Sequence, residues 1–183
     1  MIDFVETVAN LDQATDLHLA RLLILLEGFA EGQAGGPIEG LTKLAKLDFL
    51  LRYPVMLERA LTAKGRSTEN VQLEDYERLS VESEMVRYRF GPWDHRYREF
   101  LNILVAKGLA SVSVEGRKVV ISVTEQGRER AKQLGEHDLF SHYARRARLL
   151  KRNFDLTATN LMRFIYDTFP EIVSLRSNAP IEI

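Results

Sequence analysis

The chain has 183 residues, of which 45% are hydrophobic and 28% charged, and its formal net charge at pH 7 is −1. This length and composition are typical of one globular domain, and a net charge near zero offers no general attraction for nucleic acid. The chain has no cysteine, which excludes disulfides, thiolate metal sites and cysteine nucleophiles and fits a reducing compartment.

The amino-terminal residues predict a protein of the cytoplasm. They are acidic and lack the basic stretch that precedes the apolar run of a secretory signal. The longest apolar run, Leu22 to Leu26, is far shorter than the roughly 20 residues that a membrane-spanning helix needs. We therefore expect a cytoplasmic protein with no membrane partner.

The first third of the chain predicts three helices. Residues 13–31 are apolar on nearly every side, which is typical of a helix buried at the centre of a fold. The glycine-rich residues 32–40 lack the Gly-Lys-Ser/Thr triplet of a phosphate-binding loop, so we expect a flexible connector there. Leucine spacing predicts a helix over 41–52, and Pro54 suits the first turn of a helix over 54–64.

The next segment predicts an acidic insertion, a strand and a helix. Residues 66–84 carry six acids and only two bases, so we expect a solvated insertion with one or two short helical turns. Alternating side chains predict a half-buried strand over Met85–Phe90. A turn at Gly91-Pro92 is then expected to open a helix over 94–107, with Asp94 as its cap.

A β-hairpin is predicted directly after that helix. Gly108 ends the helix, and two alternating strands follow over 109–114 and 117–123. Glu115-Gly116 supplies the tight turn between them, because glycine accepts a positive φ. Helix, stop and hairpin together are the sequence outline of a winged helix.

Further helices are predicted after the hairpin. Thr124 is expected to cap a helix over 125–134, a second helix runs from after Gly135 to about Asn153, and a third spans 156–168. The predicted fold class is therefore mainly α with a small β-hairpin, a winged-helix domain with additional N- and C-terminal helices. We expect one domain over 1–183, with the helical core and wing in 13–123 and a C-terminal helical extension in 124–183.

No residue pattern predicts an enzyme. His137 and His142 are five residues apart, which does not place two metal ligands on one helical face, and His18 is expected to be a hydrogen-bonded structural residue. Asp94-His95 lacks an accompanying serine or cysteine nucleophile motif. We expect no catalytic residue, no metal site and no cofactor.

A basic cluster near the end of the chain is a candidate contact surface for a partner or for DNA. It contains Arg145, Arg146, Arg148, Lys151 and Arg152 without an intervening acid. Such clusters bind phosphates or acidic protein surfaces. The cluster is equally well explained without a binding function, as a solvated helix face or as a set of ion pairs with the acidic insertion. The functional and the non-functional interpretation both stay open.

A second candidate surface lies around the predicted winged helix. Trp93, beside Pro92, is expected to be partly exposed and to serve as an anchor for a partner. Two features weaken a role in reading DNA bases: Tyr97 and Phe100 occupy the helix, and Asn102 is its only side chain suited to adenine. The basic residues of this surface are Arg87, Arg89, Arg96, Arg98, Arg117 and Lys118.

Three segments carry a resemblance to a known family. They are LDFLLRYP over 47–54, RYRFGPWD over 87–94 and FPEI over 169–172. With these segments, most of the chain resembles the middle component of ABC-three-component systems, which include the Lamassu-type antiphage defence operons. The resemblance implies a small winged-helix subunit without an active site. Such a subunit would bridge an SMC-like ABC ATPase and an effector, often a nuclease, and would help to hold the effector inactive.

We therefore expect a non-catalytic adaptor. The Gly91–Tyr97 turn and the 145–152 cluster would be its contact surfaces, one for the ATPase head and the other for the effector or DNA. Charge reversal of Arg145, Arg146 and Arg148 together would then abolish complex formation and leave the fold intact. Two alternatives remain: a winged-helix DNA-binding transcription regulator, and an antitoxin-like protein that neutralises one toxic enzyme.

Overall fold

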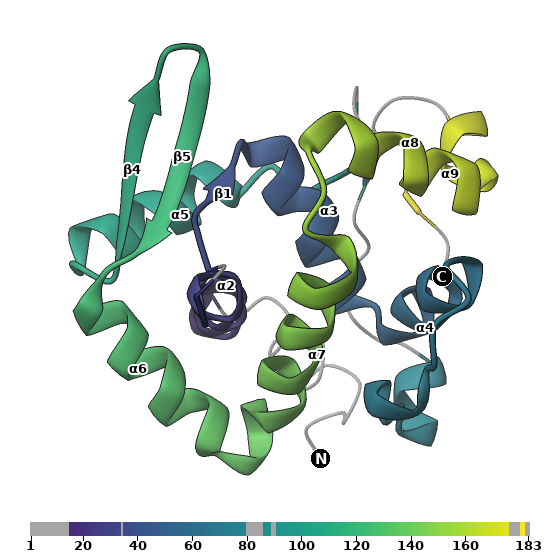
Figure 1. Ribbon diagram of the computed structural model, residues 1–183, viewed down its shortest axis with the longest axis horizontal. Helices are drawn as coiled ribbons and strands as arrows, with labels where there is room; N and C mark the ends of the chain where they lie inside the picture. The colour runs from purple at the N-terminus through teal and green to yellow at the C-terminus, as the bar shows by residue number, and fades with distance from the viewer. Residues whose placement is uncertain (1–14, 34, 80–85, 89–90, 176–179, 182–183) are drawn as a thin grey trace, which may run out of the picture.

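The computed structural model describes residues 15–33, 35–79, 86–88, 91–175 and 180–181 (Figure 1). Within these ranges the chain is mostly helical with a small antiparallel sheet. Its α-helices are α2 (Thr15–Ala30), α3 (Leu41–Arg52), α4 (Pro54–Ala63), α5 (Tyr97–Ala106), α6 (Glu125–Glu136), α7 (Asp138–Phe154), α8 (Ala158–Thr168) and α9 (Pro170–Ser174). Two 3₁₀ helices are η1 (Glu69–Val71) and η2 (Asp75–Leu79), and the strands are β1 (Ile38–Glu39), β2 (Val86–Tyr88), β3 (Gly91–Trp93), β4 (Ala110–Glu115) and β5 (Lys118–Val123).

Helix α2 is the central element, as its all-round apolar sequence predicts. Figure 1 looks along this helix and shows α6, α7, α3 and the β4–β5 hairpin around it. Leu22, Leu25 and Phe29 have no exposed surface. Gly28 brings α7 close, because a Cβ at this position would lie 2.8 Å from Cβ of Ala147. The core therefore forms around α2 and continues as one cluster through the other helices.

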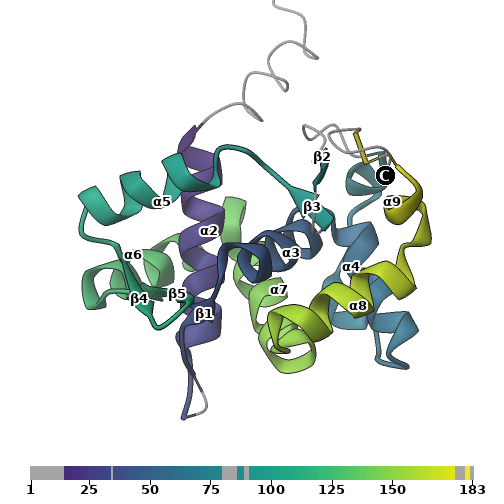
Figure 2. The same cartoon turned by 90° about the horizontal axis from the view of Figure 1, so that it is seen from above.

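Helices α3 and α4 confirm the predicted pair and its break at Tyr53-Pro54. Proline occupies the first turn of α4, where its missing N–H costs no hydrogen bond. Figure 2 shows α3 between two groups of elements, with α5, α6 and the hairpin on one side and α4, α8 and α9 on the other. The short η1 and η2 confirm the predicted helical turns in the acidic segment.

The sheet contains one strand that the sequence did not predict. The predicted hairpin is present as β4 and β5, but the order is β1-β5-β4, because Ile38 pairs with Ile121 in antiparallel register. The glycine-rich segment is therefore not only a connector. Gly116 has a φ of 63° and stands with Arg117 between the paired Glu115 and Lys118, so the central turn residues lie one position later than predicted.

The prediction of a Gly91-Pro92 turn that opens a helix is wrong. Both residues lie in β3, which pairs with β2, and the edge of a two-stranded sheet tolerates a proline without an N–H. Helix α5 begins only at Tyr97, and its N-cap residue is Arg96 without a side-chain cap. Asp94 is therefore not the cap, because its carboxylate binds arginines instead.

The C-terminal helices differ in detail from their predicted bounds. Thr124 caps α6, as predicted, and its hydroxyl accepts a hydrogen bond from the Gly127 N–H at 3.0 Å. Gly135 does not separate two helices but lies inside α6, where a Cβ would be 3.0 Å from Ala144 on α7. Leu139 is 57% exposed in the first turn of α7, although the apolar spacing of this helix would place it on the inward face.

The described residues contain neither a membrane-spanning helix nor a cluster of metal-ligating side chains. No helix there is long and apolar enough to cross a bilayer. In the same part of the chain, no three or more histidine, aspartate or glutamate side chains are grouped so that they could hold a metal ion.

Candidate functional site

A buried ionic cluster joins α2, α3 and α5. Nε of Arg21 donates to Oδ1 of Asp48 at 2.7 Å, and the hydroxyl of Tyr97 donates to Oδ2 of Asp48 at 2.7 Å. Burial alone would raise the pKa of Asp48, but the guanidinium groups of Arg21 and Arg52 and the Tyr97 hydrogen bond lower it below its ordinary value. This carboxylate is therefore charged and fully engaged within the protein.

His18 belongs to the same cluster and confirms the prediction of a structural histidine. Its Nδ1 accepts from Nη2 of Arg21 at 3.0 Å, and its ring stacks on Phe100 with 5.1 Å between the centroids. Phe100 and Tyr97 are both buried, so neither lies on the exposed face of α5. The exposed positions of that helix include Arg98 and Asn102.

A second ionic cluster connects α3 with β3. Nη1 of the buried Arg52 lies 3.2 Å from Oδ2 of Asp94, and Nη2 of Arg96 lies 2.6 Å from the same oxygen. Burial would raise the pKa of Asp94, but hydrogen bonds from Arg96 and the charge of Arg52 hold it well below its ordinary value. Arg96, a predicted contact residue, is therefore half-buried and already paired within the chain.

The third motif segment packs against the first. Phe169 meets Phe49 edge to face with 5.7 Å between the ring centroids, and the Arg59 guanidinium lies 4.8 Å from the centre of the Phe169 ring. Arg59 also forms an ion pair with Glu171. The described parts of the segments 47–54, 87–94 and 169–172 thus meet around α3, and Arg52 of the first segment pairs with Asp94 of the second. This part of the molecule is a structural framework.

The aromatic surface predicted around Trp93 is largely internal. Trp93 is half-buried, and its ring packs edge to face on Tyr97 with 5.5 Å between the centroids. Arg89 lies outside the described residues. The backbone of Arg87 is described in β2, opposite Pro92, but its side chain lies outside the described part. The structure does not bring these residues together as a described basic patch.

Arg146 differs from its predicted surface position, because it is only 1% exposed. Its Nε donates to the Val71 carbonyl at 3.0 Å, and Nη1 lies 2.6 Å from Oε1 of Glu77. This residue therefore pairs with the acidic segment, which was one of the two open interpretations. Charge reversal of Arg146 would break this buried pair, so the expectation that a triple reversal leaves the fold intact is corrected.

The remaining basic residues of α7 are distributed around the helix. Arg145, Arg148 and Arg152 stand three and four positions apart and share one face. Arg145 contacts Gln72, Arg148 lies 3.0 Å from Glu31, and Arg152 is exposed. Lys151 instead lies 2.5 Å from Asp155, which also binds Lys43. The exposed basic surface is therefore smaller than the sequence cluster.

The tip of the hairpin carries the last two predicted contact residues. Arg117 is exposed in the turn, and Nζ of Lys118 lies 2.8 Å from Oε2 of Glu39 on β1. Both partners of this ion pair are more than half exposed, so solvent screens their attraction and the pair contributes little to stability. Lys118 is therefore free to exchange Glu39 for another anion at little cost.

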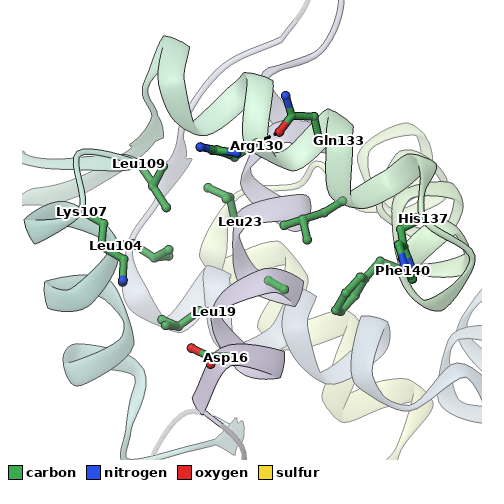
Figure 3. A pocket seen from close by; sticks show the side chains of 12 residues that line it. Asp16, Leu19, Leu23, Leu104, Lys107, Leu109, Arg130, Gln133, His137 and Phe140 are labelled. Carbon is green, nitrogen blue, oxygen red and sulfur yellow. Dashed lines mark hydrogen bonds between the residues drawn. The ribbon is translucent and has the colours of Figure 1, made fainter.

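A groove that the sequence analysis missed opens between α2, α5, α6 and the start of α7 (Figure 3). It has a volume of about 410 Å³, and Leu19 and Leu23 of α2 and Leu104 of α5 form its floor. Leu109, Leu134 and Phe140 extend the apolar lining, and polar side chains stand at the rim: Asp16, Lys107, Arg130, Gln133 and His137. Leucine spacing predicts that these floor residues are buried, but the groove itself depends on how α2, α5, α6 and α7 pack together.

Comparisons with known proteins place the chain in a family. No curated protein and no solved structure matches it. The family model described as ABC-three component (ABC-3C) system Middle Component 4 matches residues 30–162, which include α3 to α7 and the whole sheet. The chain therefore belongs to the Middle Component 4 family of ABC-three component systems.

Proposed function

We propose that this protein is the non-catalytic adaptor subunit of an antiphage defence complex, in which it bridges an SMC-like ABC ATPase and an effector, often a nuclease, and helps to control the effector. The observation that carries the proposal is the family match over residues 30–162. A middle component works together with the other components of its system. A Lamassu-type operon is the setting that the sequence resemblance suggests.

The order of elements supports a winged helix within this adaptor. Helix α2, strand β1, helix α3, helix α5 and the β4–β5 hairpin follow one another as in a winged helix, and the sheet order β1-β5-β4 is the order of that fold. The segment from α4 to β3 is an insertion between the second and third helices of the motif. In DNA-binding relatives of this architecture the third helix enters the major groove.

The buried charges support a subunit without an active site. The carboxyls of Asp48 and Asp94 have perturbed pKa values, of the kind that often mark catalytic sites, and Arg146 is a buried charge. Here each of them is held by side chains or carbonyls from other elements, at distances of 2.6 to 3.2 Å. The contacts of these three residues hold helices and loops together, and this structural role accounts for their burial.

The surfaces left for partners are basic and separate. One is the α7 face with Arg145, Arg148 and Arg152, and the other is the hairpin tip with Arg117 and Lys118. Either can meet an acidic protein surface or a phosphate backbone. With a net charge of −1, the chain offers such attraction only locally.

The bridging role is tested by co-expression of the tagged ATPase and the effector with and without this chain. The proposal expects the effector to co-purify with the ATPase only when this chain is present. Equal recovery of the effector without it would overturn the bridge. A regulator would instead give a dimer of the isolated chain that binds one operator sequence tightly, and an antitoxin would bind one enzyme without any ATPase.

A further inference from the structure

We propose that the groove between α2, α5, α6 and α7 is the docking site for an amphipathic helix of another component of the complex. The helix would present leucine-like residues at helical spacing and carry carboxylates beside them. This inference rests on the proposed function, because it assigns a partner element to the adaptor.

The floor of the groove has the shape and chemistry of a helix-binding surface. Leu19 and Leu23 are four residues apart, so they stand one above the other on α2, and Leu104 of α5 faces them (Figure 3). The lining from Asp16 to Leu23 spans eight residues of α2, and the seven steps between them cover roughly 10 Å at 1.5 Å per residue. That length accommodates roughly two turns of a partner helix, with anchors at positions i, i+4 and i+7.

Two cations stand at the rim without an ion pair among the described residues. Arg130 donates only to the side chain of Gln133, at 3.1 Å, and Lys107 has no acidic partner in the described chain. Arg128 and Lys132, on either side of Arg130 in the same helix, both lie within 4.0 Å of Glu27 on α2. Two cations of α6, Arg128 and Lys132, thus pair with Glu27, and Arg130 at the groove is available for a carboxylate from outside.

The combination of an apolar floor and a cationic rim selects the kind of partner. A nucleic acid would pair with Lys107 and Arg130, but its backbone would not cover the leucines. An amphipathic helix satisfies both features, because residues three and four apart supply the apolar stripe and neighbouring positions supply the acids. Asp16 lies in the first turn of α2 and lines the groove there. Its negative charge would repel an acid of the bound helix at that end, so the partner helix would bind in one orientation.

Two exposed apolar residues are sequence neighbours of residues that line the groove. Val105 follows the floor residue Leu104 and is 41% exposed, and Leu139 precedes the lining residue Phe140 and is 57% exposed. Large apolar side chains that are exposed beside an apolar groove are typical of protein interaction sites. A helix longer than the groove would cover them as well.

A single introduced cysteine tests the site, because the chain has none of its own. The complex is assembled with Gln133→Cys at the groove rim, labelled with a benzophenone maleimide and irradiated. Thr159→Cys is the matched control, an exposed polar residue on α8. The proposal expects the groove position alone to be joined to a peptide of another component, and that peptide to be an amphipathic, acidic helix. Equal products from both positions, or products with DNA or with a second copy of this chain, would overturn it.

Charge reversal measures the contribution of the rim. Lys107→Glu with Arg130→Glu is compared with Arg66→Glu and Arg163→Glu, which carry the same change in net charge at exposed positions outside the groove lining. We expect the groove pair to bind the cross-linked component about tenfold more weakly, which corresponds to about 1.4 kcal/mol, and the control pair to bind as the unaltered chain does. Equal affinities of the two variants would refute the docking site.

The two proposals fail in different ways. If the unaltered chain assembles with the other components and the groove variants bind equally well, the adaptor role stands and the groove assignment is wrong. If no component binds even the unaltered chain, the proposed function is wrong and the docking helix falls with it.

Discussion

Replacement of Asp48 by asparagine tests the buried cluster most severely. Asp48→Asn keeps the shape of the side chain but removes the negative charge that faces Arg21 and Arg52, all three of which are at most 3% exposed. Breaking a buried ion pair by removal of one partner costs about 3–5 kcal/mol, because the remaining charge stays desolvated. Domains have a total free energy of unfolding of about 5–15 kcal/mol, so this change would remove a large share of it.

The assay is urea unfolding at neutral pH, followed by the fluorescence of the single tryptophan. Trp93 is a suitable reporter because its ring packs on Tyr97, whose hydroxyl binds Asp48. Asp167→Asn, at an exposed position on α8, is the matched control and should change the free energy of unfolding by less than about 0.5 kcal/mol.

A double variant separates the charge from the packing. Arg21→Met with Asp48→Leu removes both charges of the closest ion pair and keeps apolar volume, while Arg52 keeps its ion pair with Asp94, so we expect the double variant to be more stable than Asp48→Asn alone. A loss of less than about 1 kcal/mol for Asp48→Asn would refute the reasoning, since a surface pair contributes that much. The reasoning would also be refuted if the double variant lost more free energy of unfolding than the two single variants together.

Three further predictions concern α6 and α7. Thr124→Ala should lower the free energy of unfolding by about 1 kcal/mol in thermal or urea unfolding, because the Gly127 N–H loses its acceptor; no change would show that the cap is dispensable. Arg146→Met should lower the free energy of unfolding, measured by urea unfolding, several times more than Arg148→Ala does, because only Arg146 is buried with its partner Glu77. Equal losses would contradict a structural role for the Arg146–Glu77 pair. Burial and the nearby Arg146 lower the pKa of His142 from 6.5 to about 4, so the unfolded chain binds the proton first and stability falls as pH drops below about 6.5. Between pH 7 and pH 5, the free energy of unfolding of His142→Asn should therefore fall by about 2 kcal/mol less than that of the unaltered chain. The same pH dependence in both proteins would contradict this.

The elements with a strong apolar period could be predicted from the sequence. Helices α3, α4 and α8 lie within about two residues of their expected bounds, because each buries one face and begins or ends at a proline, glycine or capping residue. The β4–β5 hairpin follows from alternation and Gly116. These signals are local, and in the described residues the tertiary contacts of these elements agree with them.

The elements that the sequence missed depend on distant partners. Strands β1 and β3 have two and three residues, too few for a period, and β1 exists because Ile38 meets Ile121. Pro92 has the sequence signal of a turn residue, but pairing with Arg87 of β2 places it in a strand. Gly135 looks like a helix stop, yet it is retained inside α6 because Ala144 approaches there.

The candidate site shows the same division. Arg146 and Arg148 are identical in type and two positions apart, and only the docking of η1 and η2 on α7 makes one buried and the other exposed. The groove has no sequence signal of its own, because Leu19 and Leu104 look like ordinary core leucines. The motif segments, by contrast, are visible in the sequence, but their structural role depends on the contact between Asp94 and Arg52, which are distant in the chain.

The most direct test of the adaptor account is a pull-down of the tagged protein from cells that express its whole three-component system, with the recovered proteins identified by mass spectrometry. The account predicts recovery of a large coiled-coil ABC ATPase together with a second, effector enzyme. Recovery of this chain alone, as a dimer that shifts its own promoter DNA, would contradict the account in favour of a transcription regulator.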